Sequence, residues 1–187
     1  VYKRQGFPDL LAAGPVIPHS DGAGVITAVG EGVSPSRVDE RVFVYQAQYG
    51  RQLGTAAETI ALDSTRAPVL PDAASFEVGA CIGIPIMTAH RCVFADGPVA
   101  GQLIIVTGGA GRVGHYAIQW AHRAGARVIA TASNEEDATA CREAGAEAVV
   151  NHRVPDWGIA VLDLTEGQKI DRAIDVEFGA NLPELLN

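Results

Sequence analysis

Three glycines within residues 104–114, IIVTGGAGRVG, have the spacing of a dinucleotide-binding loop. Gly109, Gly111 and Gly114 fit the pattern GxGxxG, which here follows an apolar β-branched run and precedes a helical pattern. Glycine permits a tight turn and a close approach to pyrophosphate, while free N–H groups at the helix start attract an anion. The alternative is a glycine-rich turn that binds nothing. The flanking strand and helix favour the pyrophosphate site.

The residues after the second predicted strand bear on which nicotinamide dinucleotide is bound. An NAD site usually places Asp or Glu about 20 residues after the glycines, where it bonds the ribose 2′-OH. Residues 131–134 are instead Thr-Ala-Ser-Asn, a small and neutral set that leaves room for a 2′-phosphate. Arg112 and the Asn-His-Arg segment 151–153 supply basic side chains nearby. The acidic residues 135–137 oppose this, unless they only stabilise a helix N-terminus. The balance favours NADPH over NADH.

Strands and helices alternate from residue 103 onward, which predicts an α/β fold. Apolar runs predict strands at 103–107, 126–132, 146–150 and 169–176, and periodic segments predict helices at 111–125 and 133–145. We expect Ser133 to be the N-cap of the second helix. Alternation at this spacing implies a parallel sheet with right-handed crossovers. Asp175 and Glu177, near the end of the last strand, either do acid-base work or only shape the cleft there.

The first part of the chain has a different sequence pattern. Short β patterns at 24–33, 41–46 and 58–62 are separated by Gly and Pro, which predicts a small, irregular β-rich domain. Beyond it we expect a helix capped by Asp72, an interruption at Pro85 and a second helix over 88–94. The chain therefore divides into a domain of residues 1–86 and a domain of residues 87–187.

The composition excludes several classes of function. The 187 residues carry a net charge of −8 with no basic run, which argues against nucleic-acid binding. The three cysteines, Cys81, Cys92 and Cys141, are too widely spaced for a disulfide framework, so we expect a reduced, cytoplasmic setting. No apolar run reaches the length of about 18 residues that a membrane helix needs, so no membrane association is expected.

Several motifs, in order along the chain, resemble those of the medium-chain dehydrogenase/reductase superfamily. Within it the chain is most similar to the zinc-free, zeta-crystallin-like quinone oxidoreductases. The motifs are PHSDGAGVITAVGEGV, RVFVYQ, GACIGIPIMTAHR, VTGGAGRVG, AGAEAVVNHR and VEFGAN. The resemblance runs from about Gly6 to Asn181. It implies a partial GroES-like catalytic domain over residues 1–86 and a partial Rossmann domain, with a doubly wound parallel sheet, over residues 87–187. We therefore expect an internal fragment that lacks the N-terminal part of the first domain and the C-terminal part of the second.

The resemblance also bears on metal. Zinc-dependent members carry a GHE-like element where this chain has His19, Ser20 and Asp21. Ser20 falls at the position of the liganding histidine, and a serine hydroxyl is a poor zinc ligand. The four closely spaced cysteines of a structural zinc lobe are also absent from the sequence. The resemblance thus implies catalysis without zinc.

The residues expected to contact the cofactor follow from the resemblance. Around the phosphate-binding turn they are Gly109, Ala110, Gly111, Arg112, Val113 and Gly114. Ser133 matches a small residue at the adenosine 2′ position, and His152 matches a ring near the adenosine phosphate. Many relatives place a lysine on the 2′-phosphate where this chain has Asp137, a departure that weakens the NADPH prediction.

Three further residues are expected near the nicotinamide half of the cofactor. Thr88 resembles the threonine that faces the nicotinamide ring, and it is the residue expected to be catalytic. Asn181 matches a position near the same half of the cofactor. Phe7 stands where the family often has a tyrosine that lines the cleft.

The resemblance implies an NADPH-dependent oxidoreductase that reduces a quinone or an α,β-unsaturated carbonyl by hydride transfer. Two alternatives stay open: a relative of the zinc-type alcohol dehydrogenases, and a non-catalytic, crystallin-like protein that only binds NADPH. The full-length parent is expected to be a homodimer with a small-molecule substrate. Residues 1–187 alone are expected to be inactive.

Overall fold

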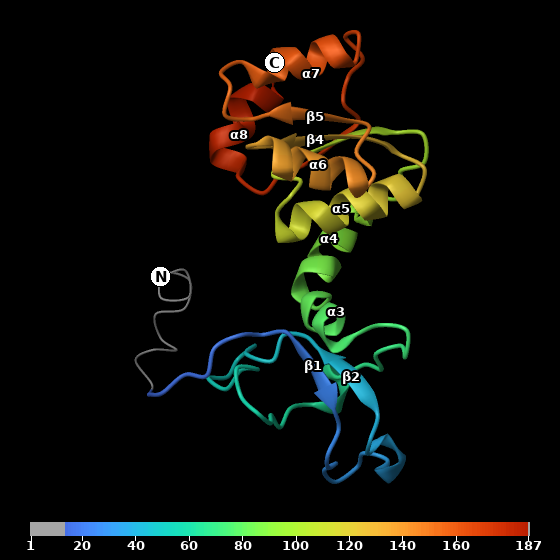
Figure 1. The fold of residues 1–187 in the computed structure, drawn as a ribbon, viewed down its shortest axis with the longest axis vertical. Helices are drawn as coiled ribbons and strands as arrows, with labels where there is room; N and C mark the ends of the chain where they lie inside the picture. Colours follow the sequence, from blue (N-terminus) through green and yellow to red (C-terminus); the bar gives the residue numbers. More distant parts are fainter. Residues whose placement is uncertain (1–13, 187) are drawn as a thin grey trace. The chain divides into compact units, whose positions relative to one another are not determined.

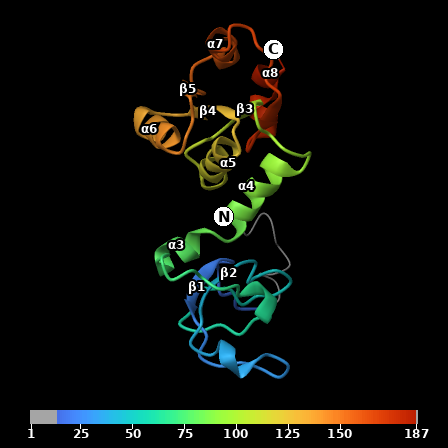
Figure 2. The ribbon, with the colours of Figure 1, turned by 90° about the vertical axis from the view of Figure 1, so that its right-hand side faces the viewer.

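The computed structural model describes residues 14–186, and the chain forms two compact units. The first ends at Ile84 and the second begins at Pro85. Figures 1 and 2 show the β-rich first unit, which carries β1 and β2, and the α/β second unit, which carries β3 to β6. Phe7 lies outside the described residues.

Four parallel strands form the sheet of the second unit: β3 (Leu103–Val106), β4 (Arg127–Ala132), β5 (Ala148–Asn151) and β6 (Arg172–Ile174). Their spatial order is β5-β4-β3-β6, so β3 lies between β4 and β6. The sheet therefore extends from β3 in one direction and then in the other. In open α/β sheets such a switch point leaves a crevice at the carboxyl ends of the strands, where ligands bind.

Helices cover both faces of this sheet. Successive residues of a strand point to opposite faces, so alternate residues of β3 pack into two separate core clusters. Ile104 and Val106 of β3 belong to one core cluster, which includes residues of α4 (Ile84–Phe94), α5 (Arg112–Arg123) and α6 (Glu135–Glu143). Leu103 and Ile105 belong to a second cluster, with residues of α7 (Trp157–Leu164) and Leu185 of α8 (Phe178–Leu185). Figures 1 and 2 show α7 on the side of the sheet opposite to α5 and α6. The predicted α/β class with a doubly wound parallel sheet is confirmed.

Two predictions for the second unit were wrong in detail, and one helix was not predicted. Asn134, not Ser133, is the N-cap of α6, because its side-chain oxygen accepts from the N–H of Asp137 at 2.8 Å. The segment after β5 contains α7, whose apolar residues WGIAVLDL were hidden by the polar residues before them. β6 covers only Arg172–Ile174 of the predicted strand 169–176.

The first unit contains the antiparallel pair β1 (Gly22–Val25) and β2 (Arg41–Val44), with Gly22 opposite Val44. The unit also has two short 3₁₀ helices. η1 (Pro35–Arg37) lies between the two strands in sequence, and η2 (Ser64–Arg66) lies after them. Its small core contains Val42, Val44, Ala47 and Ala67. The strand predicted at 24–33 ends at Val25, and residues 58–62 are not a strand.

The helix predicted near Asp72 is α3 (Phe76–Cys81), and its N-cap is Ser75, whose hydroxyl accepts from the N–H of Val78 at 3.3 Å. Asp72 lies too far before the helix to cap it. Pro85 does not interrupt the next helix but sits in the first turn of α4, where its missing N–H has no partner to lose.

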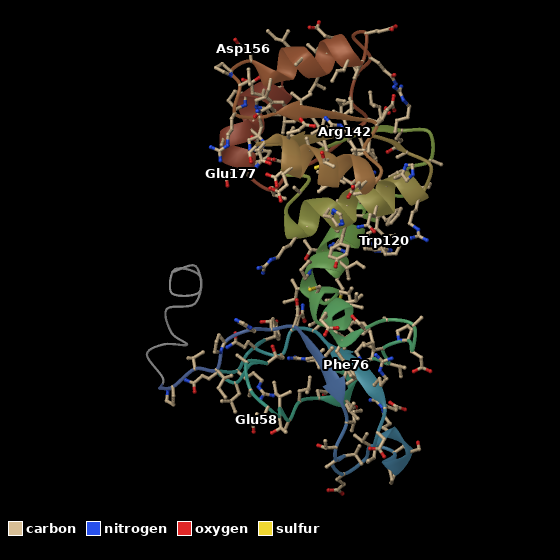
Figure 3. The ribbon with its side chains drawn as sticks, in the orientation of Figure 1. Glu58, Phe76, Trp120, Arg142, Asp156 and Glu177 are labelled. Carbon is tan, nitrogen blue, oxygen red and sulfur yellow. The ribbon has the colours of Figure 1, made fainter. Side chains whose placement is uncertain are left out.

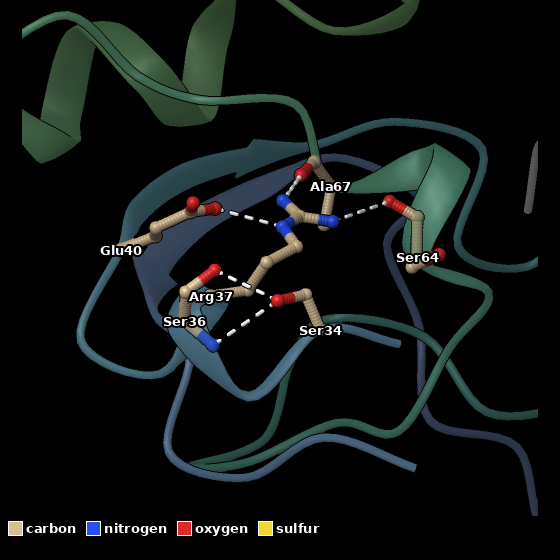
Figure 4. Close-up of polar contacts among 6 residues, drawn as sticks. All are labelled: Ser34, Ser36, Arg37, Glu40, Ser64 and Ala67. Atoms are coloured by element: carbon tan, nitrogen blue, oxygen red, sulfur yellow. Dashed lines mark hydrogen bonds and ion pairs between the residues drawn. The ribbon is translucent and has the colours of Figure 1, made fainter. Parts of the chain in front are cut away.

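Arg37 joins the two 3₁₀ helices of the first unit, as Figure 4 shows. Its Nε lies 2.7 Å from a carboxylate oxygen of Glu40. Its two Nη atoms donate to the carbonyl oxygens of Ser64 at 3.2 Å and Ala67 at 2.6 Å. These bonds connect segments about 30 residues apart in sequence, and they add to the backbone bonds by which residues 68–70 pair with β2.

Replacing Arg37 with Met is expected to destabilise the first unit by about 2 kcal/mol, because three hydrogen bonds to a charged group are lost. Arg51→Met is the matched control, since Arg51 is half-buried like Arg37 but donates to one carbonyl, that of Ala61. Amide hydrogen exchange of peptides that contain residues 41–44 measures the loss. The fluorescence of Trp120 and Trp157, both in the second unit, should not change. Equal acceleration of exchange in the two variants would contradict the assignment.

Candidate functional site

The loop between β3 and α5 is fixed to the end of β4. The N–H of Gly108 donates to the hydroxyl of Thr131 at 3.0 Å, and the N–H of Gly109 donates to the carbonyl of Thr131 at 2.9 Å. Gly108 has a φ of +59°, a left-handed conformation that favours glycine. The turn therefore lies at the carboxyl edge of the sheet, beside the switch point.

A side chain at each of the three motif glycines would meet different neighbours. A Cβ on Gly114 would lie 2.3 Å from the carbonyl oxygen of Gly108, so α5 packs directly on the loop backbone. A Cβ on Gly109 would lie 2.8 Å from the sulfur of Cys141 and 2.9 Å from the Cβ of Ala130. At Gly111 the nearest atom would be the Gly108 oxygen at 3.1 Å. Gly114 and Gly109 are thus required by packing, whereas Gly111 mainly keeps the outer surface of the turn open.

The start of α5 is arranged to receive an anion. Gly111 is its N-cap, with no side-chain cap, and the first helical bond runs from the N–H of His115 to the Gly111 carbonyl. The N–H groups of Arg112, Val113 and Gly114 precede that bond and have no partner within the helix. Together with the helix dipole, they fit a phosphate group.

The side chains around the predicted phosphate turn divide into two kinds. Ala110 and Val113 are partly buried and pack against the core, so only their backbone groups are available to a nucleotide. Arg112 is exposed and forms no ion pair with any residue of 14–186.

A pocket of about 480 Å³ opens beside the loop at the carboxyl edge of the sheet. Its lining includes Gly108 of the loop, His152 after β5 and Asn181 of α8. The fold thus brings together His152 and Asn181, two predicted cofactor residues, and the start of the glycine loop. Glu177, labelled in Figure 3, also lines this pocket. Thr88, Ser133 and residues 109–114 of the loop are not part of this lining.

Thr131, which the sequence analysis did not single out as a site residue, is central to this pocket. It is 1% exposed, and its hydroxyl contacts both the Gly108 N–H and, at 3.2 Å, the Nδ1 of His152. The backbone N–H of His152 also donates to the carbonyl of Ala132 at 3.1 Å. One buried hydroxyl therefore links the glycine loop to the imidazole. A polar residue at the carboxyl end of a parallel strand is the signal that could have revealed it.

Asp175 organises the other side of the pocket. One of its carboxylate oxygens accepts from the Thr107 hydroxyl, from the side-chain amide of Asn181 at 2.8 Å and from the N–H of Glu177 at 3.3 Å. Burial alone would raise the pKa of Asp175, but the hydrogen bonds from Thr107, Asn181 and two backbone N–H groups together lower it below its ordinary value. Asp175 is a fixed carboxylate that holds Asn181 at the pocket wall, which favours the shaping role over acid-base work.

The remaining predicted residues lie apart from the pocket lining. Thr88 is exposed on α4, and its hydroxyl bonds to none of residues 14–186. Ser133 is half-buried after β4, and its hydroxyl donates to a carboxylate oxygen of Asp137 at 2.9 Å. The strand end expected to be neutral therefore carries a carboxylate, because α6 turns Asp137 back toward it.

The segment that aligns with a zinc ligand lies in the first unit. His19 is exposed with a φ of +75°, and the Ser20 carbonyl accepts from the N–H of Ala47 at 2.8 Å. One carboxylate oxygen of Asp21 accepts from the N–H of Ile84 at 2.9 Å, and burial raises the pKa of Asp21 despite this bond. Among residues 14–186 no group of three or more His, Cys, Asp or Glu side chains has the geometry to hold a metal ion. In the same range, every helix is too short or too polar to cross a membrane.

Gly114→Ala is expected to destabilise the second unit by about 2 kcal/mol, because the new methyl group would overlap the Gly108 carbonyl and must displace the loop. Denaturant unfolding followed by the fluorescence of Trp120 and Trp157 measures the change. Gly179→Ala in α8 is the control: its Cβ would meet nothing within 4 Å, and we expect a neutral or slightly stabilising effect. A Gly114→Ala protein as stable as the wild type would refute the close packing.

Asp175 also predicts a pH dependence. Because its pKa is lowered on folding, its contribution to stability is fully present above the ordinary value of 3.8 and is lost as the pH falls through the lower folded value. The unfolding free energy of the wild type should therefore exceed that of Asp175→Asn above this value, and the difference should shrink on acidification below it. Asp163→Asn, on the exposed side of α7, is the control. A difference that is independent of pH would contradict the ionised state.

Comparison with known proteins shows similarity along nearly the whole chain. Residues 113–186 match the family described as zinc-binding dehydrogenase. The quinone oxidoreductase of Mus musculus is 36% identical over 94% of this chain and 51% of its own length. The chain spans about half the length of the curated relatives it matches.

Solved structures with the same fold include two types of enzyme. An NAD-dependent alcohol dehydrogenase superimposes with a TM-score of 0.84 and 29% identity, covering 92% of this chain and 57% of its own. The Escherichia coli quinone oxidoreductase, in complex with NADPH, has a TM-score of 0.79 and 28% identity, covering 94% of this chain and 53% of its own. With the motifs, the sheet order and the glycine loop described above, these similarities show that the chain belongs to the medium-chain dehydrogenase/reductase superfamily, in its quinone oxidoreductase group.

Proposed function

We propose that this chain provides the nucleotide site of an NADPH-dependent oxidoreductase that reduces a quinone or an α,β-unsaturated carbonyl without a metal. The observation that carries the proposal is the loop between β3 and α5. Its backbone leaves no room for a Cβ at Gly114 and presents the uncapped N–H groups of α5 beside a pocket at the carboxyl edge of the sheet. Such a loop suits a pyrophosphate.

The residues around the pocket have distinct parts in this proposal. The N–H groups of Arg112, Val113 and Gly114 bind the phosphates. His152, held by Thr131 and by the Ala132 carbonyl, lies near the adenosine side, where its ring limits the pocket. Asn181, held by Asp175 at 2.8 Å, presents its amide on the nicotinamide side. His152 and Asn181 are each fixed by a partner in the chain, so this part of the site is preorganised before a nucleotide enters.

A bound nicotinamide would supply hydride, which is why the protein needs no strong general acid or base of its own. The described residues fit that division of work. Asp175 is committed to three hydrogen-bond donors, and Glu177 is exposed at the start of α8. Thr88, with its free hydroxyl on α4, is proposed to position the nicotinamide ring, and a proton from solvent completes the reduction.

The relatives support NADPH and a quinone in different degrees. The mouse relative is named a quinone oxidoreductase, and the Escherichia coli structure contains NADPH, whereas the alcohol dehydrogenase neighbour is NAD-dependent. Neighbours of both dinucleotide types share this fold, so the preference must come from the residues of this chain. A cytoplasmic location and a homodimer belong to the same proposal.

The proposal is tested with a longer protein that contains the whole chain. We expect it to oxidise NADPH when a quinone or an enone is added, as measured by the loss of reduced-nicotinamide absorbance. A metal chelator should leave the rate unchanged, because no step needs zinc. Residues 1–187 alone should bind NADPH, measured by its fluorescence, with little or no turnover.

Three outcomes would contradict separate parts of the proposal. Loss of activity with the chelator would rule out the metal-free mechanism and favour the zinc-type alternative. NADPH binding without oxidation by any quinone or enone would favour the non-catalytic alternative. A tenfold preference for NADH would overturn the choice of cofactor.

A further inference from the structure

The hydroxyl of Thr131, at the end of β4, is buried between two polar neighbours. Its oxygen lies 3.0 Å from the backbone nitrogen of Gly108 and 3.2 Å from Nδ1 of His152. Within residues 14–186 this hydroxyl forms no other hydrogen bond. The two contacts therefore decide where the hydroxyl proton points.

The direction of each hydrogen bond follows from the chemistry of the three groups. A backbone N–H can only donate, so the oxygen of Thr131 accepts from Gly108. A hydroxyl has one proton to donate, and a buried donor without an acceptor is costly. Among the described residues, the acceptor within reach of this proton is Nδ1 of His152. The hydroxyl thus donates to Nδ1, and Nδ1 carries no proton of its own.

This direction also fixes the other ring nitrogen of His152. A neutral imidazole carries one proton, and the hydrogen bond at one nitrogen selects the nitrogen that holds it. With Nδ1 as the acceptor, the proton is on Nε2. The reverse tautomer would direct two donors, Nδ1–H and the Gly108 N–H, at the oxygen of Thr131 and leave the buried hydroxyl proton without an acceptor.

Nε2 of His152 is open to a ligand. It forms no hydrogen bond with residues 14–186, and it is not one of the fully buried polar atoms that lack a partner. His152 also lines the pocket beside the glycine loop. The pocket therefore meets the ring nitrogen whose proton Thr131 has fixed from the opposite side.

We infer that Thr131 is a positioning residue of the nucleotide site: its hydroxyl holds His152 in the Nε2–H tautomer, so that the pocket wall presents a hydrogen-bond donor. The inference rests on the proposed function and refines it. A wall that donates selects a part of the dinucleotide with an acceptor oxygen. Because the same hydroxyl accepts from Gly108, the glycine loop and the imidazole are ordered together.

The tautomer is measured by NMR of ¹⁵N-labelled residues 1–187 at about pH 8.5, where histidine rings are neutral. Long-range ¹H–¹⁵N spectra should show His152 as the Nε2–H tautomer, with its signals identified by their loss in His152→Phe. Thr131→Val keeps the branched shape but removes the hydroxyl, so the Nδ1 resonance should move to that of an imidazole nitrogen without a hydrogen bond. Thr131→Ser should restore the wild-type resonance.

Thr165→Val is the matched control for these spectra. Thr165 is also buried in the second unit, but its hydroxyl donates to the carbonyl of Leu162 at 3.2 Å and has no contact with His152. The variant should leave the His152 resonances and the affinity for NADPH unchanged.

A double-mutant cycle separates the effect of Thr131 on the imidazole from its effect on the loop. Thr131→Val should weaken NADPH binding, measured by the fluorescence of the nucleotide, through both groups. In the His152→Phe background only the effect on the loop remains, so the same substitution should reduce the affinity by a factor about fivefold smaller.

Three results would overturn the role of Thr131. They are an Nδ1–H tautomer in the wild type, an Nδ1 resonance that is the same in wild type and Thr131→Val, and an equal loss of NADPH affinity in the two backgrounds. Failure of the wild type to bind NADPH would instead remove the proposed nucleotide site, and with it the positioning role, even where the spectra show the expected tautomer.

Discussion

The contact between the start of α5 and the loop before it is the constraint on which the site depends. With only 2.3 Å between the Gly108 oxygen and any Cβ that Gly114 could carry, the helix rests on the loop backbone itself. This contact directs the first N–H groups of α5 to the carboxyl edge of the sheet. It also presses the loop against β4, where Thr131 accepts one N–H with its hydroxyl and a second with its carbonyl. Loop, helix and second strand therefore form one rigid corner.

Polar groups at the ends of the strands form hydrogen bonds beside this corner, at the edge of the pocket. Thr107 follows β3, Thr131 belongs to β4 and Asp175 follows β6, and all three are at least half-buried. Each makes hydrogen bonds to the backbone or side chain of a neighbouring segment, so the switch point has few loose polar groups. A buried polar group without a partner is costly. The second carboxylate oxygen of Asp175, which is buried without a partner among residues 14–186, is therefore a notable exception at the pocket wall.

The sequence predicted the elements with strong periodicity and missed those fixed by tertiary contacts. The strands of the second unit were predictable because β-branched runs such as 103–106 are buried on both faces. Residues 58–62 were predicted as a strand but are not one, and the carbonyl of Ala61 accepts instead from the side chain of Arg51. Likewise the motif located the glycine loop, whereas Thr131 and Asp175 acquire their partners only when strands distant in sequence align.

Asp137 shows most clearly why residue type and spacing were insufficient for the cofactor. Taken along the sequence, the end of β4 is Thr-Ala-Ser-Asn and is neutral, while Asp137 belongs to the next helix. The cap formed by Asn134 winds the first turn of α6 so that the third helical residue points back to Ser133. A carboxylate four positions beyond Ser133 thereby becomes part of the strand end. The charge at the end of β4 is set by the geometry of a helix cap, which the order of residue types along the sequence does not reveal.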